Sequence, residues 1–143
     1  MTVKNQIKQV LEKWRFPILR ETECDLIFRY QMNYVHVIVS SDEDSDAISV
    51  LSVGIFNVGS EKEMMLGLMA CNELNIRLIQ VKLFIDSDAD LIIAAEFFLK
   101  TQDDLEYLLK LSLDSVIDAK KQFIQEYEKL KAEEEYGQED EQK

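Results

Sequence analysis

The stretch that decides the fold is residues 78–99, LIQVKLFIDSDADLIIAAEFFL. It contains two runs in which apolar and polar side chains alternate, Leu78 to Asp86 and Asp90 to Leu99, the period-2 pattern of half-buried strands. A loop at residues 87–89 sets the odd-numbered apolar residues opposite one another, as Ile85–Leu91, Leu83–Ile93, Val81–Ala95 and Ile79–Phe97. A loop one residue shorter would set apolar residues opposite polar ones, so the alternation predicts an antiparallel hairpin with this loop.

Three more strands are predicted before this hairpin. Residues 24–31 alternate in the same way, and a tight turn at residues 32–33 would pair them with residues 34–40. The acidic residues 41–46 are typical of a solvated loop, and the Val- and Ile-rich residues 47–58 predict a longer third strand.

Three helices are predicted around the strands. The apolar spacing over residues 2–14 is that of an amphipathic helix. The capping-box sequence Ser60-Glu61-Lys62-Glu63 predicts the start of a second helix, whose apolar residues fill most of its circumference, so burial on more than one side is expected. Thr101 is a candidate N-cap for a third helix with one long apolar stripe, formed by Leu105, Leu109, Ser112, Val116, Ala119, Phe123, Tyr127 and Leu130.

The order of these elements, helix-strand-strand-strand-helix-strand-strand-helix, predicts an α+β fold with an antiparallel sheet. Residues 1–130 are expected to form a single domain, because a chain of 143 residues buries roughly 70% of its unfolded surface. Residues 131–143 contain six acidic residues and two lysines with little apolar content, which predicts a disordered acidic tail.

The second helix ends in Cys71-Asn-Glu-Leu-Asn75, followed by the strand Gln80–Asp86, an acidic turn and Leu91-Ile-Ile-Ala-Ala95. With the order of elements, this sequence resembles the type III secretion chaperone-like fold and, within it, the YbjN-like family, whose label is sensory transduction regulator. The resemblance covers residues 3–130 and implies a small, acidic, cytoplasmic, bacterial protein. It also implies a protein that is often a homodimer, binds other polypeptides and catalyses nothing.

Several classes of function are disfavoured by the composition. The only histidine is His36, and the four glycines form neither a nucleophile elbow nor a phosphate-binding loop, so we expect no enzymatic activity. Cys24 and Cys71 are far apart in sequence and have no CxxC pattern, so no metal or cofactor is expected and a reducing cytoplasm fits them. A formal charge of −12 disfavours nucleic acid, and no apolar run is long enough for a membrane span.

One chemical alternative stays open, a calcium-responsive acidic protein. The pattern Asp-x-Asp-x-Asp occurs in both predicted acidic loops, as Asp42, Asp44 and Asp46 and again as Asp86, Asp88 and Asp90. Alternating aspartates supply hard oxygen ligands, although neither loop has the glycine and glutamate positions of an EF-hand. Aspartate is also a common turn residue, so the pattern has a purely structural explanation.

Apolar residues that the predicted fold does not bury indicate a protein-binding function, chaperone-like or regulatory. On the even-numbered face of the hairpin, Phe84 lies opposite Ile92, and Phe98 follows among polar residues. A covering helix could bury this face; otherwise it is a homodimer or partner surface. The end of the long helix, with Phe123, Tyr127 and Leu130, has the same two interpretations. Strand addition at a sheet edge is a further way to hold a partner.

Overall fold

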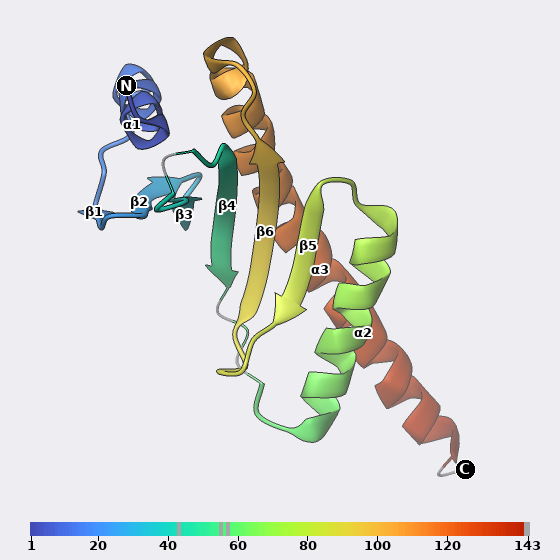
Figure 1. The fold of residues 1–143 in the computed structure, drawn as a ribbon. Coiled ribbons are helices and arrows are strands. Elements are labelled where there is room, and N and C mark those ends of the chain that lie inside the picture. Colours follow the sequence, from blue (N-terminus) through green and yellow to red (C-terminus); the bar gives the residue numbers. More distant parts are fainter. Residues whose placement is uncertain (43, 55, 57, 142–143) are drawn as a thin grey trace.

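The computed structural model describes residues 1–42, 44–54, 56 and 58–141. Over these residues the chain forms a six-stranded antiparallel sheet with helices packed on it (Figure 1). The elements, in chain order, are α1 (Val3–Lys13), β1 (Arg20–Glu21), β2 (Asp25–Tyr30), β3 (Asn33–Val39), β4 (Ala47–Gly54), α2 (Glu61–Arg77), β5 (Val81–Ile85), β6 (Leu91–Phe98), the short 3-10 helix η1 (Gln102–Asp104) and α3 (Leu105–Glu141). The α+β class and the predicted order of elements are confirmed, with the short strand β1 added.

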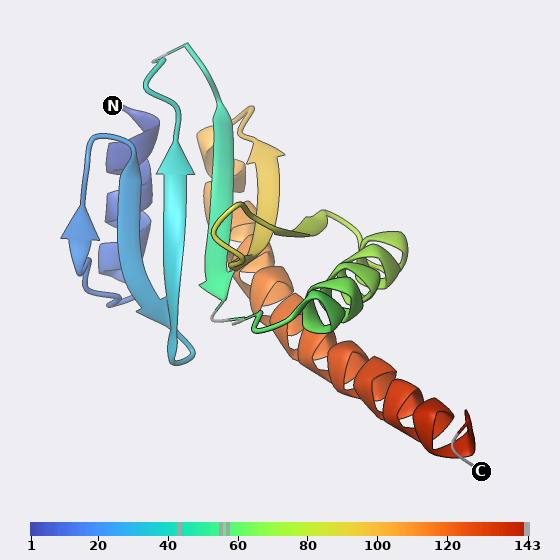
Figure 2. The ribbon, with the colours of Figure 1, turned by 90° about the horizontal axis from the view of Figure 1, so that it is seen from below.

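The sheet has the strand order β1-β2-β3-β4-β6-β5. Both α1 and α3 lie against the same face of it, behind the strands in Figure 2, and α2 packs beside α3 and the outer strand β5. This arrangement leaves the opposite face of the sheet without a helix in the described part of the chain. No helix among the described residues is both long enough and apolar enough to cross a bilayer.

The β5–β6 hairpin has the register that the alternation predicts, with Val81–Ala95, Leu83–Ile93 and Ile85–Leu91 as partners. The amide of Asp86 donates to the carbonyl of Asp90 at 3.0 Å and closes the loop at residues 87–89. The predicted pair Ile79–Phe97 does not form, because β5 begins at Val81.

The first hairpin turns one residue earlier than predicted. Tyr30 pairs with Asn33, so the loop is Gln31-Met32, and both of its residues have positive φ angles of 47° and 67°. Such a turn has the twist that joins two antiparallel strands tightly. The third predicted strand ends at Gly54, and its residues 55 and 57, like residue 43 of the acidic loop, lie outside the described residues.

The core lies between the helices and the covered face of the sheet. The predicted stripe of α3 is buried from Leu105 to Tyr127, and Leu130 is half-buried against the same cluster. The side chains that α1 adds to this core are Ile7, Val10 and Leu11. The apolar periodicity of the sequence therefore located the inner face of each of these helices correctly.

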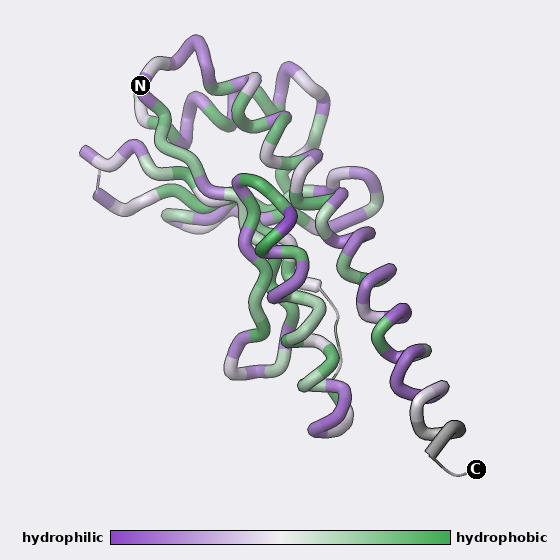
Figure 3. The backbone as a smooth tube through the Cα atoms, turned by 90° about the vertical axis from the view of Figure 1, so that its right-hand side faces the viewer, coloured by the Kyte–Doolittle hydropathy of each residue, from purple (hydrophilic) through white to green (hydrophobic). Residues whose placement is uncertain are grey.

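The long helix continues beyond the boundary expected at residue 130. It runs through the acidic segment to Glu141 and projects past the sheet, where its residues are mostly hydrophilic (Figures 1 and 3). Glutamate, lysine and alanine are good helix formers, so low apolar content alone does not end a helix. An ion pair of 3.3 Å between Lys62 and Glu134 also links this segment to the start of α2. Residues 142–143 of the expected tail lie outside the described residues.

Candidate protein-binding surfaces

The uncovered side of the sheet, the open sheet face, presents several large apolar side chains. Phe84 and Val53 both pair with Ile92, so these three side chains lie next to one another, as predicted for Phe84 and Ile92. Ile92 is only 9% exposed at the centre, whereas Phe84 is 41% and Phe98 70% exposed. The covering helix that was one interpretation of this face is absent among the described residues, so the phenylalanines face solvent.

The charged groups of the open sheet face are mostly paired with each other. Lys82 forms an ion pair with Glu96, and the ammonium of Lys82 lies 6.0 Å from the ring centre of Phe84. His36 Nδ1 lies 2.9 Å from Asp25 Oδ2. The Ser49 hydroxyl donates to Glu96 at 3.4 Å. Apolar side chains with paired charges around them are typical of the surfaces by which proteins associate.

A second exposed apolar surface, the α2 stripe, consists of Met65, Leu68, Met69 and Ile76. Their exposed fractions lie between 47% and 71%. The expectation that this helix is buried on more than one side is therefore wrong: the buried side chains lie on one side, which packs on α3 and β5. Apolar residues all round a helix indicate two apolar surfaces, but the sequence does not tell whether the second is covered within the chain.

Asn75 of α2 closes the outer edge of the sheet. Its side-chain Nδ2 donates to the carbonyl of Leu83 at 3.0 Å, and the amide of Leu83 donates to its Oδ1 at 2.8 Å. These two backbone groups point away from β6, towards the position where an added strand would pair. The Asn75 amide therefore replaces a neighbouring strand at the centre of β5, and strand addition there would first have to displace it.

The three predicted partner-binding residues of α3 lie inside the chain. Phe123 and Tyr127 are 2% and 8% exposed, and the Phe56 ring packs edge-on against both, at centroid distances of 5.2 Å and 4.8 Å. Leu130 is half-buried in the same cluster. These residues lie on the helix side of the sheet, so the structure does not bring them together with Phe84 and Phe98.

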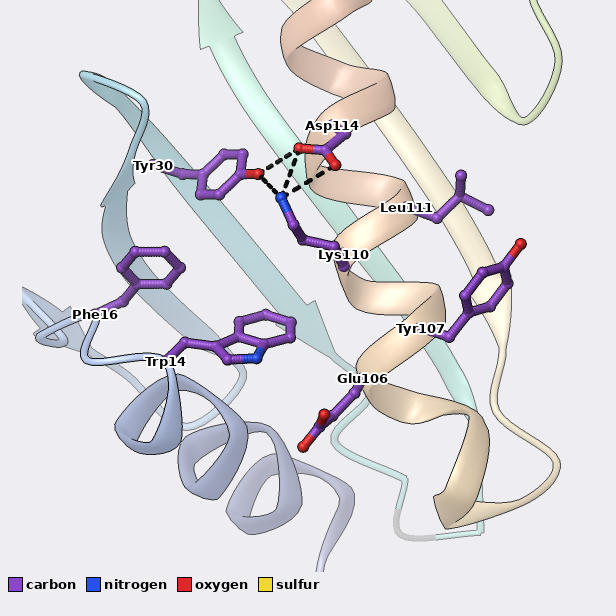
Figure 4. A pocket seen from close by; sticks show the side chains of 8 residues that line it. All are labelled: Trp14, Phe16, Tyr30, Glu106, Tyr107, Lys110, Leu111 and Asp114. Atoms are coloured by element: carbon purple, nitrogen blue, oxygen red, sulfur yellow. Dashed lines mark hydrogen bonds and ion pairs between the residues drawn. The ribbon is translucent and has the colours of Figure 1, made fainter.

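A hollow of about 650 Å³ separates the end of α1 from the first turns of α3 (Figure 4). This aromatic groove is lined by Trp14, Phe16, Tyr30, Glu106, Tyr107, Lys110, Leu111 and Asp114. In Figure 4 the Tyr30 hydroxyl, the Lys110 ammonium and the Asp114 carboxylate meet at one end of the groove. No sequence pattern predicted this groove, because its two sides are far apart in the chain and each has the pattern of an ordinary helix end.

Burial, and then the hydrogen bond to Asp114, raises the pKa of Tyr30. The hydrogen bond to Tyr30 raises the pKa of Lys110. Both shifts favour the neutral phenol and the charged ammonium, so the Lys110–Asp114 ion pair leaves this end of the groove without net charge.

The two aspartate loops are organised as turns. Asp86 Oδ1 accepts hydrogen bonds from the amides of Asp88 and Asp90, at 3.0 Å and 2.9 Å, and Asp42 Oδ1 accepts one from Asp44 at 3.0 Å. One carboxylate oxygen from each of Asp86, Asp88 and Asp90 nevertheless lies within 4.8 Å of the others. The geometry accounts for the loops as turns and leaves the calcium alternative open for the second loop.

No protein-family model matches this chain. No curated protein matches it either. An uncharacterized protein from Methanothermobacter thermautotrophicus has a similar structure, with a TM-score of 0.60 and 15% identity over 88% of this chain and 96% of that one. YbjN from E. coli matches with a TM-score of 0.61 and 11% identity, over 83% of this chain and 91% of that one.

The type III secretion chaperone SycH from Yersinia pestis, in complex with a fragment of YscM2, gives a lower TM-score of 0.49 and 9% identity, over 80% of this chain and 97% of that one. At identities this low, structural similarity establishes the fold and nothing more. The resemblance in fold that the sequence suggested is confirmed by the structural match to YbjN. This chain has a YbjN-like fold.

Proposed function

We propose that this chain is a non-enzymatic protein-binding domain, which forms a homodimer through the α2 stripe and holds a second polypeptide on the open sheet face. The observation that carries the proposal is the presence of two apolar surfaces, on α2 and on the sheet, that no described residue covers. Contiguous apolar surface with a polar rim is expensive to leave in water and usually marks an interaction site.

The α2 stripe suits pairing with a second copy of itself. An antiparallel pair of α2 helices centred on Met69 sets Glu61 of one copy beside Arg77 of the other, twice by symmetry. The same geometry packs Met69 against its counterpart and brings Met65 and Leu68 of each copy near Met69 of the other, and it sets the two helix dipoles in opposite directions. Apolar packing and the helix dipoles therefore favour this orientation, in which Arg77 would share its charge between Glu61 of the other copy and its own partners Glu73 and Glu126.

On the open sheet face, the residues that could act as acid, base or nucleophile are not arranged for catalysis, which supports a binding function. His36 is held by Asp25, while the nearby Ser49 hydroxyl bonds to Glu96. A serine nucleophile needs its hydroxyl hydrogen-bonded to the base, and Ser49 is bonded to Glu96 instead of His36.

The two cysteines are both free thiols. Burial raises the pKa of Cys71 to about 11, so its thiol is unreactive. These thiols fit the cytoplasmic location that we propose.

The homodimer is tested by light scattering at micromolar concentration with Leu68→Asp and the matched control Leu19→Asp. The two leucines are 50% and 54% exposed, so neither substitution should disturb the core. We expect the wild type and Leu19→Asp to be dimers and Leu68→Asp to be a monomer. A monomeric wild type, or equal behaviour of the two variants, would refute pairing through α2.

The sheet-face partner is tested by pull-down from the native cytoplasm with the double variant Phe84→Asp, Phe98→Asp. Met32→Asp is the control, because Met32 is 88% exposed in a turn away from this face. Partners recovered with the wild type and with the control should be lost with the double variant. If every recovered partner stays bound, the proposed sheet-face site is wrong.

The second candidate, a calcium response, is favoured only by the convergence of the Asp86, Asp88 and Asp90 carboxylates. Its test is calorimetric titration with calcium, with Asp88→Asn as the comparison. The carboxylate that accepts the backbone hydrogen bonds of the turn is that of Asp86, so this substitution should leave the turn intact. Saturable heat that the substitution removes would support a site. An absence of heat at millimolar calcium would end the idea.

A further inference from the structure

The wall of the aromatic groove is preformed by the end of α1. The amide of Phe16 donates to the carbonyl of Leu11 at 2.9 Å and that of Arg15 to Glu12 at 3.0 Å, with Arg15 at a φ of 62°. This is the Schellman ending of a helix, which fixes the direction of the chain after it. The Phe16 ring packs edge-on against both Trp14 and Tyr30, at 6.2 Å and 5.7 Å. The rings are therefore held in place before any ligand arrives.

The floor of the groove is one face of α3, with Tyr107, Lys110, Leu111 and Asp114 at helical spacing. Tyr107 is 69% and Leu111 40% exposed, although both have large apolar surfaces. A ligand that covers these side chains removes apolar area from water without any change in the fold.

The charged groups around the aromatic groove favour one class of ligand. The Lys110 ammonium already binds Asp114 and Tyr30, and Lys13 binds Glu106 at 2.7 Å. Arg15 lines a separate hollow beyond Phe16. Further acidic residues lie at the two ends of the same stretch of chain, namely Asp103, Asp104 and Asp118. These ion pairs cancel, so the excess charge beside the groove is that of Asp103, Asp104 and Asp118, for which no ion pair is found among the described residues, and the groove itself offers exposed aromatic rings.

We infer that the aromatic groove binds an apolar segment of another polypeptide that carries lysine or arginine side chains. Aromatic faces attract cations, and the alkyl stems of lysine and arginine pack well on rings such as Trp14 and Tyr107. A second copy of this chain is disfavoured, since it would bring the same carboxylates together, and the net charge of −12 disfavours nucleic acid and anionic membranes. The inference rests on the proposed protein-binding function and adds the chemistry of the partner and a separate place for it.

Trp14 lines the groove and is the only tryptophan in the chain, so its fluorescence reports binding in the groove. The probe is a synthetic amphipathic peptide of leucine and lysine, titrated into the full chain while Trp14 fluorescence is recorded. A matched peptide with glutamate in place of lysine is the charge control. We expect a saturable spectral shift with the lysine peptide, weakened by added salt, and none with the glutamate peptide.

The groove is located with Tyr107→Ala and the matched control Tyr136→Ala. Both tyrosines belong to α3 and both are 69% exposed, but Tyr136 lies far along the helix from the groove. Loss of a ring from the centre of an interface weakens binding, so Tyr107→Ala should raise the dissociation constant by about tenfold, which corresponds to about 1.4 kcal/mol, and Tyr136→Ala should leave it unchanged.

Three results would overturn the inference: no saturable shift, equal shifts with both peptides, or equal effects of the two alanine substitutions. A change in oligomeric state on titration would identify self-association as the source of the signal and also count against it. The proposed homodimer is tested at Leu68, and the proposed sheet-face site is tested at Phe84 and Phe98. Failure of the groove proposal is therefore distinguishable from failure of the proposed function.

Discussion

Replacing Asn75 with alanine removes the contact that closes the outer edge of the sheet. The wild-type amide makes two hydrogen bonds to the backbone of Leu83, of 3.0 Å and 2.8 Å, in a part-buried position. Each bond contributes about 1 kcal/mol net, and a partly buried backbone group left without a partner costs about 1 kcal/mol or more. The expected loss is therefore about 2–4 kcal/mol of unfolding free energy.

Urea denaturation followed by circular dichroism measures this loss. With an m value of about 2 kcal/mol per molar urea, a loss of about 3 kcal/mol lowers the midpoint by about 1.5 M. Asn72→Ala is the matched control, because Asn72 is an exposed asparagine of the same helix. That substitution should change the free energy of unfolding by less than about 0.5 kcal/mol.

A second measurement separates the local effect from a general loss of stability. In Asn75→Ala, amide hydrogen exchange should accelerate more at Leu83 than at neighbouring core amides, because only the Leu83 amide loses its hydrogen-bond acceptor. If Asn75→Ala and Asn72→Ala unfold at the same urea concentration, or if exchange at Leu83 is unchanged, the Asn75 side chain does not close the edge.

Three further predictions concern backbone strain, packing and pH. Arg15→Gly should raise the unfolding free energy by up to about 1 kcal/mol in urea denaturation, because glycine adopts the φ of 62° without strain. Gly67→Ala should lower it by about 1–3 kcal/mol in the same assay, despite the better helix propensity, since the new Cβ would lie 2.8 Å from the Phe56 ring. Stability should fall above about pH 10. Folding raises the pKa of Tyr30, so the unfolded phenol ionises first, and it raises the pKa of Lys110, whose stabilising charge is lost as the pH passes that raised value. Tyr30→Phe should flatten this decline in a series of urea titrations.

The register of the β5–β6 hairpin and the inner stripe of α3 could be predicted because both depend on periodicity. A shift of one residue in the hairpin would have exposed Leu83 and Ile93, so a single register satisfies the pattern. The turn at Gln31-Met32 was misplaced because neither residue is a typical occupant of positive φ, whereas Asn33 is.

The candidate site was predictable only where it depends on a local pattern. Alternation placed Phe84 and Ile92 together, but whether a helix covers them is decided by the path of the whole chain. Phe123 and Tyr127 have the same apolar character as Phe84, and the Phe56 ring that packs against both of them comes from a segment whose approach the sequence does not show. The Asn75–Leu83 contact and the aromatic groove join residues from different elements, for which a single sequence holds no periodic signal.

The length of α3 sets a spacing between surfaces of the molecule. At 1.5 Å per residue, Tyr107 in the groove and Tyr127, where the helix packs near α2, are separated by about 30 Å along one continuous rod. An extended polypeptide covers that distance with about nine residues. A partner that engages the groove and also reaches towards the α2 side therefore needs two binding elements joined by a linker of at least that length. A partner with a shorter linker would reach only one of the two surfaces, so the length of α3 sets the minimum linker that bivalent binding would need.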